Sequence, residues 1–384
     1  MKCKLSDICS FRKGKVEVES LNAKNYISTE NMLPNKCGIT EASSLPTVSL
    51  TQEYKNGDVL VSNIRPYFKK IWQAQYDGGC SNDVLVFVPK PNTDKDFLYY
   101  VLADDDFFTY SMATSKGTKM PRGDKTSIMQ YEVPLIDLQV QEKIASVLKA
   151  LDKKIELNNE INNNLEQQAM ALFKSWFIDF EPFDRQVPKT WINGVLGDFV
   201  EIKRGGSPRP IQNFLSDSGF HWLKISDATG ITSPFINEIK EYIIEAGLKK
   251  TVYLKSGSLV LSNSATPGLP KILDIDTCIH DGWLYFPSSK FSNEYLYLYF
   301  KHIRDNLIAL GNGSVFTNLK TDILKNYPTY LPTEDVLKKF DGLVQPIFSM
   351  ILSKTREIKR LAEIRDTLLP KLMSGELDVS DTEL

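Results

Sequence analysis

The amino-acid sequence predicts an α+β fold, with two tandem, pseudo-symmetric α/β domains separated by two long antiparallel coiled-coil helices. Three observations lead to this prediction. The 384-residue chain repeats itself at about half its length, both copies show the same order of short strands and helices, and each copy ends in a long heptad pattern. A period this long indicates a tandem duplication rather than a solenoid.

The duplication is visible in short matching segments. GDVLVSN at 57–63 returns as GSLVLSN at 257–263, and CSND at 80–83 returns as CIHD at 278–281. Short apolar runs bounded by Gly, Asn, Asp or Pro predict strands in both copies, and tyrosine-rich amphipathic segments predict a helix in each. The strands are expected at 59–61, 84–88, 259–261 and 284–286, and the helices at 97–108 and 295–310.

Two apolar patterns with strict 4-3 spacing predict the long helices. At about 1.5 Å per residue, each helix of some 40 residues measures roughly 60 Å. Both seams carry polar residues near the middle, Asn158 and Asn162 in the first and Lys354 in the second, which favours one register at a cost in stability. Two ordinary amphipathic helices, each packed on its own domain, are the alternative. The seam positions are Ile144, Leu148, Leu151, Ile155, Asn158, Asn162, Leu165, Ala169, Leu172 and Trp176, then Phe340, Val344, Ile347, Ile351, Lys354, Ile358, Leu361, Arg365, Leu368 and Leu372.

These elements divide the chain into five parts. We expect a first domain at 1–136, a long helix at 137–182, a second domain at 183–332, a second long helix at 333–376 and a tail at 377–384. The starts of the two helices are not equivalent, because Gln141 in the first copy is matched by Leu337 in the second.

Composition narrows the class of protein. The five cysteines are scattered without a CxxC pair, and no apolar run approaches the 18 residues of a membrane span. We therefore expect free thiols, a cytoplasmic location and no membrane association. The net charge is −2, but segments 137–182 and 333–384 carry −3 and −2, so the rest of the chain carries +3.

Motifs for catalysis and metal binding were searched for without success. The chain has no GxxxxGK[ST] phosphate loop, no (N/D)PP(Y/F) tetrad and no Ser/His/Asp arrangement, and its three histidines lack metal-ligand spacing. We predict no catalytic residue, no metal site and no cofactor in this chain.

Basic loops with interleaved aromatic and polar residues occur in matching places. Lysine and arginine neutralise phosphates, while arginine and asparagine also reach base edges, so these loops predict contact with DNA. The candidate residues are Arg65, Tyr67, Lys69, Lys70, Lys116, Lys119 and Arg122 in the first copy, and Lys203, Arg204, Arg209, Asn263, Lys271 and Lys320 in the second.

Longer motifs resemble the specificity subunits of Type I restriction–modification enzymes. YEVPLIDLQVQEKIASVL at 131–148 and ALFKSWFIDFEPF at 171–183 resemble the start and end of the central helix of that family, and RDTLLPKLMSGEL at 365–377 resembles its C-terminal helix end. LSDIC at 5–9 and LGDFVEIKRGGSPRP at 196–210 resemble the starts of its two target-recognition domains. The resemblance spans the whole chain.

The resemblance implies a non-catalytic subunit that recognises double-stranded DNA. Each target-recognition domain would read one half of a bipartite site, and the helices would set the spacer and dock two modification subunits. The resemblance also implies S-adenosylmethionine in these methyltransferase partners, and ATP and Mg in two restriction subunits, which act as endonuclease and translocase.

Three other functions stay open from the sequence. The chain could recognise DNA for a related enzyme whose partner fuses methylation and cleavage, or it could be a structural adaptor that binds no DNA. A stand-alone DNA-modifying enzyme is the third, and the missing cofactor motifs argue against it.

Overall fold

The computed structural model describes residues 2–311 and 319–379, which form two compact units. Unit 1 comprises Met1–Lys154 and Leu361–Leu384, and unit 2 comprises Ile155–Arg360. Each unit therefore contains one α/β domain and parts of both long helices, α5 (Leu138–Phe177) and α10 (Glu334–Ser374). The division differs from the five consecutive parts expected from the sequence, because both helices pass from one unit into the other.

Among its described residues, the domain of unit 1 consists of short strands, two nine-residue α-helices, two four-residue α-helices and two 3₁₀ turns (η). In chain order its elements are β1 (Lys2–Lys4), α1 (Leu5–Ile8), β2 (Cys9–Phe11), β3 (Lys15–Glu17), η1 (Val18–Ser20), β4 (Tyr26–Ile27), β5 (Leu50–Tyr54), β6 (Val59–Ser62), η2 (Pro66–Phe68), β7 (Ile71–Gln73), β8 (Gly78–Cys80), β9 (Val84–Pro89), α2 (Lys95–Ala103), α3 (Asp105–Ala113), α4 (Lys125–Ile128) and β10 (Glu132–Pro134).

The domain of unit 2 repeats this order with additional short strands. Its elements are η3 (Glu181–Phe183), β11 (Ile192–Val195), α6 (Leu196–Phe199), β12 (Lys203–Arg204), η4 (Ile211–Asn213), β13 (Leu215–Ser216), β14 (Phe220–Leu223), α7 (Ile225–Thr229), β15 (Phe235–Ile236), β16 (Tyr242–Ile243), η5 (Glu245–Lys250), β17 (Val252–Leu254), β18 (Leu259–Ser262), β19 (Pro270–Leu273), β20 (Thr277–Ile279), β21 (Trp283–Tyr285), α8 (Asn293–Gly311), α9 (Thr321–Lys325) and β22 (Pro328–Leu331).

The sheets confirm the duplication. Unit 1 has a sheet in the order β2-β9-β6-β7, and unit 2 has the matching order β12-β21-β18-β19 with β15 added at the edge. The second sheets share the order β5-β8-β4 and β17-β20-β14, each with one antiparallel and one parallel pairing. The pair β1-β10 likewise matches β11-β22.

The helix expected at 97–108 is two helices, α2 and α3. Asp104 interrupts it, because this residue has an extended backbone (φ −62°, ψ 140°) and its carboxylate accepts a hydrogen bond from the Asp106 N–H at 3.1 Å. An aspartate that caps the next helix in this way ends the preceding one. Its counterpart α8 continues without interruption from Asn293 to Gly311.

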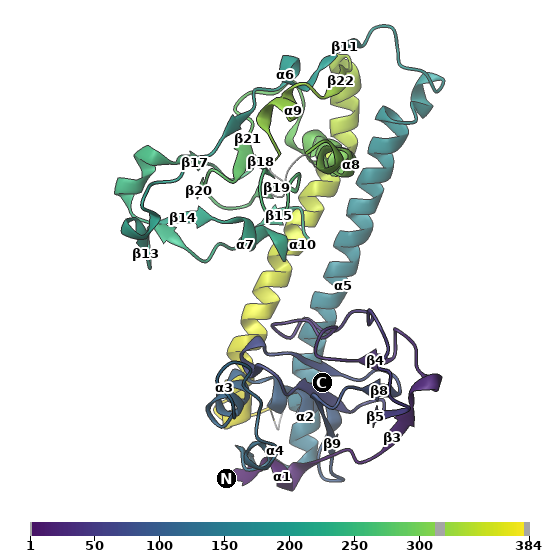
Figure 1. The fold of residues 1–384 in the computed structure, drawn as a ribbon, viewed down its shortest axis with the longest axis vertical. Helices are drawn as coiled ribbons and strands as arrows, with labels where there is room; N and C mark the ends of the chain where they lie inside the picture. The colour runs from purple at the N-terminus through teal and green to yellow at the C-terminus, as the bar shows by residue number, and fades with distance from the viewer. Residues whose placement is uncertain (1, 312–318, 380–384) are drawn as a thin grey trace. The chain divides into compact units, whose positions relative to one another are not determined.

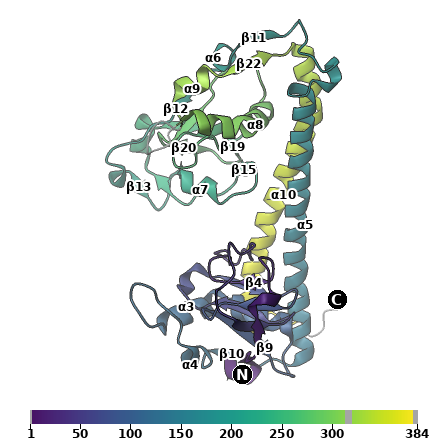
Figure 2. The ribbon, with the colours of Figure 1, turned by 45° about the vertical axis from the view of Figure 1, so that its right-hand side comes forward.

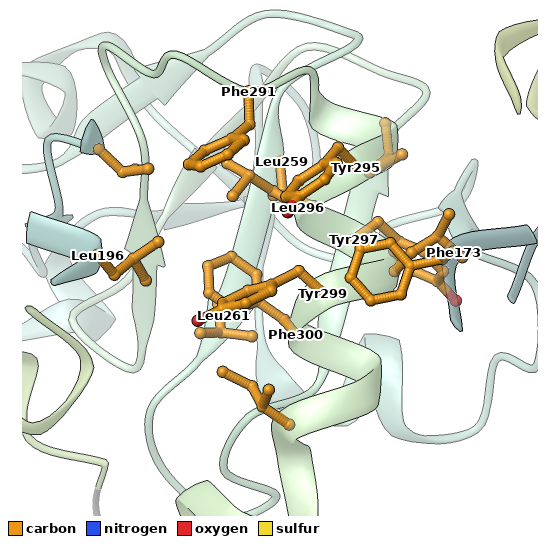
Figure 3. Close-up of a cluster of buried hydrophobic side chains, with 14 of the residues drawn as sticks. Phe173, Leu196, Leu259, Leu261, Phe291, Tyr295, Leu296, Tyr297, Tyr299 and Phe300 are labelled. Carbon is orange, nitrogen blue, oxygen red and sulfur yellow. The ribbon is translucent and has the colours of Figure 1, made fainter. Parts of the chain in front are cut away.

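The core of unit 2 lies between α8, its first sheet and α5. Figure 1 shows α8 packed against β18 and β19, and Figure 3 shows Leu259 and Leu261 of β18 beside Leu296 and Phe300 of α8. Phe173 of α5 belongs to the same core. These five side chains are at most 2% exposed. Burial of each such side chain contributes about 1.5–3 kcal/mol.

The two long helices run antiparallel within each unit, as the sequence predicts (Figure 2). In unit 1, Leu148 near the start of α5 shares a core with Leu372 near the end of α10. In unit 2, Phe173 near the end of α5 shares a core with Phe340 near the start of α10. The prediction of paired helices is therefore correct, and the alternative of independent helices is excluded within each unit.

The polar seam positions on α5 are buried, Asn158 fully and Asn162 to within 7% exposure. The Asn162 side-chain amide donates to Thr355 Oγ1 at 3.3 Å, whereas the predicted Lys354 pairs with Glu357 of its own helix. The buried positions thus drift by one residue from the strict 3.5-residue repeat, because an α-helix has 3.6 residues per turn.

Because of the same drift, Phe173 and Phe177 are buried at the end of α5, where the heptads predict Leu172 and Trp176. In α10, Phe348 is likewise buried where the heptads predict Ile347. The three phenylalanines are more deeply buried than the positions expected from the heptads. None of the helices in the described part of the chain is both long and apolar enough to cross a membrane.

Candidate nucleic-acid interface

In unit 1, three segments meet at Asn63, the residue after β6. Its backbone N–H donates to the Asp83 carbonyl at 2.8 Å, and its carbonyl accepts from the Gly123 N–H at 3.1 Å. We call Asn63, Asp83 and Gly123 the first junction. It joins the end of a central strand to the turn before β9 and to the glycine-containing loop after α3.

Gly123 packs closely against neighbouring side chains at the first junction. A Cβ atom at this position would lie 2.8 Å from both Asn63 Oδ1 and Ile128 Cδ1. A larger residue would therefore require the ends of these two side chains to move.

The first junction places Arg122 at the surface with a defined backbone. Arg122 and Lys116 exchange two backbone hydrogen bonds, at 2.8 and 3.0 Å. The Arg122 side chain is 53% exposed, and its Nη2 lies 3.1 Å from Asp83 Oδ1 and 3.4 Å from Asp83 Oδ2. One end of the guanidinium is thus held by a carboxylate, while about half of the side chain is exposed.

The second junction, in unit 2, is formed by Asn263, Asp281 and Leu319. The Asn263 N–H donates to the Gly282 carbonyl at 2.9 Å, and the Asn263 carbonyl accepts from the Leu319 N–H at 2.7 Å. Its buried side-chain amide also donates to the Asp281 carbonyl at 3.2 Å. Three segments again meet at an asparagine that follows a central strand.

Asp281 collects several donors at the second junction. Ser207 Oγ donates to Oδ1 at 2.7 Å, Arg209 Nη2 donates to Oδ2 at 3.1 Å, and Arg204 Nε donates to the backbone carbonyl. Burial alone would raise the pKa of Asp281, but the Ser207 hydrogen bond and the nearby positive charges outweigh it and lower this pKa. The carboxylate is therefore ionised at neutral pH.

A cavity of about 750 Å³ lies beside Arg209 in unit 2. Trp222 and His280 are among its aromatic lining residues, and burial lowers the pKa of His280. Since His280 Nδ1 accepts from the Gly282 N–H at 2.7 Å, the imidazole is neutral there and carries its proton on Nε2. The lining residues are Ser207, Pro208, Arg209, Pro210, Ile211, Gln212, Trp222, Lys224 and His280.

The other candidates of unit 1 surround η2 and the loop of Arg122. Lys69 pairs with Asp105 at 2.6 Å, and Lys70 donates to the Thr29 carbonyl at 2.6 Å, with a pKa that burial lowers. Tyr67 is 49% exposed, so its ring is available for contact.

Arg65, Lys116 and Lys119 lie in the segments around the first junction. The Arg65 backbone is left-handed (φ 51°), and its N–H donates to the Pro121 carbonyl at 2.8 Å. Lys116 pairs with Asp124, and Lys119 is exposed.

A comparison with protein families bears on both units. The family model described as "Type I restriction modification DNA specificity domain" matches residues 1–167 and 188–357, which is most of the chain and one match per repeat. The chain belongs to this family.

Individual proteins similar to this chain are also named specificity subunits. The chain is 28% identical to the MjaIX specificity subunit of a Type I restriction enzyme from Methanocaldococcus jannaschii over 77% of this chain and 72% of the relative. It is 27% identical to the HindI specificity subunit from Haemophilus influenzae over 92% of this chain and 94% of the relative. The fold is similar to the crystal structure of a Type I restriction–modification S subunit from M. genitalium, with a TM-score of 0.61, 15% identity and coverage of 97% and 96% of the two chains.

Within this DNA specificity chain, the second junction gathers most of the predicted residues of unit 2. Arg204, Arg209 and Asn263 meet at Asp281, and the exposed Lys320 follows Leu319 directly. Lys203 lies one residue before Arg204 and pairs with Glu201 at 2.8 Å. The loop GNGSVFTNLK at 311–320 falls mostly outside the described residues.

Lys271 is a wrong prediction. It is 2% exposed, and its Nζ donates to the carbonyls of Ile231 and Ser233 at 2.6 and 2.5 Å. Strand pairing explains the burial, because Lys271 lies opposite Val260 as Trp72 lies opposite Leu60 in unit 1. A lysine at an interior strand position cannot reach DNA, so it belongs to the core of this specificity domain.

The sequence-based search missed Asn63, Asp83 and Asp281. A search for basic residues passes over them, although the repeat of GDVLVSN and of CSND already contains all three. The five cysteines are free, and the described residues contain no group of three His, Cys, Asp or Glu side chains able to hold a metal ion.

Proposed function

We propose that this chain is the specificity subunit of a Type I restriction–modification complex, and that each target-recognition domain reads one half of a bipartite site in double-stranded DNA. The observation that carries the proposal is the duplicated junction. In both units an asparagine after a central strand holds two loops together, and an arginine reaches the surface there. Two independent reading surfaces on one chain suit a DNA site in two parts.

The proposal leaves the chemistry to partner chains. This chain would be non-catalytic and would bind two modification subunits, which bring S-adenosylmethionine, and through them two restriction subunits, which use ATP and Mg. The proposal is supported by the sequence, which carries neither a phosphate loop nor the methyltransferase tetrad.

A domain exchange tests the assignment of one half-site to each unit. Residues 1–136 would be replaced by the same region of a relative with another specificity, and methylated sites would be mapped in cells that contain the modification subunit. We expect one half of the recognised sequence to change and the other half and the spacer to stay. A change in both halves would disprove separate readers.

The helices are proposed to set the length of the spacer and to dock the modification subunits. Seven residues would be inserted after Lys154 and seven more after Arg360, where both helices pass between the units. One heptad keeps the seam in phase and adds about 10 Å, or about three base pairs at 3.4 Å each. We expect a spacer about three base pairs longer with both half-sites unchanged. An unchanged spacer in an active complex would show that the helices do not measure it.

A further inference from the structure

The two junctions share an aspartate at matching positions. Asp83 and Asp281 lie in the turn before β9 and before β21, which are matching strands of the duplicated sheet. Each holds an exposed arginine, with Arg122 and Arg209 bound through Nη2.

The two arginines come from loops that do not match. Arg122 lies in the loop after α3, 39 residues after Asp83, whereas Arg209 lies in the loop after β12, 72 residues before Asp281. If the ion pair had been duplicated together with the domain, both the aspartate and the arginine would lie at matching positions of the repeat. The same carboxylate position with differently supplied arginines indicates that the pair itself has a use at this point of the domain.

The geometry leaves each guanidinium able to contact a base. A guanidinium has five N–H donors, and the carboxylate occupies only Nη2 of each arginine. The side chains are 53% and 78% exposed. Arginine donating to O6 and N7 is the commonest specific contact to guanine.

The carboxylate also makes these arginines poor phosphate ligands. An ionised aspartate repels a phosphate group, whereas a guanine edge in the major groove carries no net charge. The aspartate also restricts the arginine to fewer rotamers before DNA binds, which lowers the entropy lost on binding. Lys119 and Lys320, which are exposed and have no ion pair among the described residues, suit phosphates instead.

We propose that Asp83 and Asp281 are positioning residues that hold Arg122 and Arg209 toward one guanine in each half of the DNA site. This inference rests on the proposed function and deepens it, because it assigns one base-reading pair to each unit. The surface-exposed ion pair itself adds little to stability, which leaves orientation as its effect.

The test measures base preference in the complex with the modification subunits. Asp83→Asn and Asp281→Asn would be compared with the wild type by selection from duplexes randomised at each position of the recognised site. We expect each variant to lose roughly tenfold or more of the preference for one G·C pair in its own half-site. The other half-site is the internal control and should keep its preference.

Matched variants separate orientation from charge. Asp77→Asn removes a carboxylate that pairs with Lys55 in unit 1, and Asp276→Asn removes one that pairs with Lys255 in unit 2. We expect both to leave every base preference unchanged. Arg122→Lys and Arg209→Lys keep the charge and lose the forked donors, so they should relax the same base pairs as the aspartate variants.

Each outcome decides between the proposals. If the wild type reads a bipartite site while Asp83→Asn, Asp281→Asn and both arginine variants keep all base preferences, this inference is wrong and the proposed function stands. If the wild-type complex shows no sequence preference at all, the proposed function fails. Because Asp281 has several partners, Asp281→Glu serves as a rescue variant, and Arg209→Lys tests the same base pair if Asp281→Asn does not fold.

Discussion

The two units share a topology but hold their domains on the long helices by different means. At the start of α5, Gln141 is 3% exposed, donates to the carbonyls of Asn92 and Ile136, and accepts from the Asp94 N–H. At the matching start of α10, Leu337 packs into the apolar core of unit 2. One copy thus uses polar contacts where the other uses apolar burial.

The opposite ends of the helices differ in another way, because their buried side chains are aromatic in unit 2 and aliphatic in unit 1. In unit 2, the ring of Phe177 lies 4.9 Å from Tyr295 and 4.8 Å from Phe340, and Phe173 lies 5.3 Å from Tyr295. The counterparts of Phe173 and Phe177 in the repeat lie 196 residues later in the chain. They are Leu369 and Met373, which are both in the core of unit 1.

In both units a tyrosine donates to a carboxylate on α5. Tyr100 donates to Asp152, which also accepts from Arg365, and Tyr297 donates to Glu166, which also accepts from Lys301. Exact symmetry would place the second carboxylate on α10. Duplication thus preserved the order of elements, while each unit acquired its own contacts to the helix pair.

Loss of a buried aromatic ring should lower the free energy of unfolding more than the other changes below. We expect Phe173→Ala to cost about 3–5 kcal/mol in unit 2, and Leu369→Ala to cost about 2–5 kcal/mol in unit 1, because both leave a cavity in a packed core. Hydrogen exchange of peptides from each unit measures the loss separately. Equal loss of protection in both units from either variant would refute two independent cores.

Removal of the carboxylates that accept from the two tyrosines should lower the free energy of unfolding by an intermediate amount. Glu166→Leu leaves the buried Tyr297 hydroxyl without an acceptor, and Asp152→Leu does the same to Tyr100, so each should cost about 2 kcal/mol. Denaturant unfolding followed by exchange in each unit reports the change. If Asp152→Leu also lowered the stability of unit 2, the contacts of Asp152 would not act on unit 1 alone, and the two units would not have separate contacts to the helices.

Lys271 should make the stability of unit 2 depend on pH. Burial lowers its pKa to about 8, against about 10.4 in an unfolded chain. Burial of the charged lysine therefore costs stability fully below pH 8, and the cost disappears as the pH rises from about 8 to about 10.5. The free energy of unfolding should therefore rise over this pH range, and the rise should be missing in Lys271→Met. A variant with the wild-type slope in unfolding free energy against pH would contradict this.

Replacement of Asn158 should change the stability least of these variants, and it should raise the stability. Its amide is fully buried and has no hydrogen-bond partner among the described residues, whereas Asn162 has Thr355. We expect Asn158→Leu to raise stability by about 1 kcal/mol and Asn162→Leu to raise it less. Thermal unfolding measures both, and light scattering detects the self-association that a fully apolar seam allows. A larger gain from Asn162→Leu would show that its bond to Thr355 contributes little.

The sequence predicted the general arrangement well and individual side chains unevenly. Heptad spacing predicted the two long helices and the burial of Asn158 and Asn162, because helical periodicity is a local property. The duplication predicted that the two helices pair and run antiparallel. Heptad spacing assigned Lys354 to the seam, whereas Thr355 is the residue that meets Asn162, because a phase drift of one residue is decided by packing. Basic loops pointed to Arg122 and Arg209, but the same criterion included the buried Lys271.

By itself, the sequence determined the duplication, the order of elements and the two long helices, because repeats and periodicities are written along the chain. Only the tertiary structure decided which residues meet. Arg122 and Asp83 are 39 residues apart, Arg209 and Asp281 are 72 residues apart, and both pairs form where an asparagine joins loops to a central strand. Strand pairing likewise decided that Lys271 points inward. Such contacts depend on register and loop closure over long separations, which no local pattern encodes.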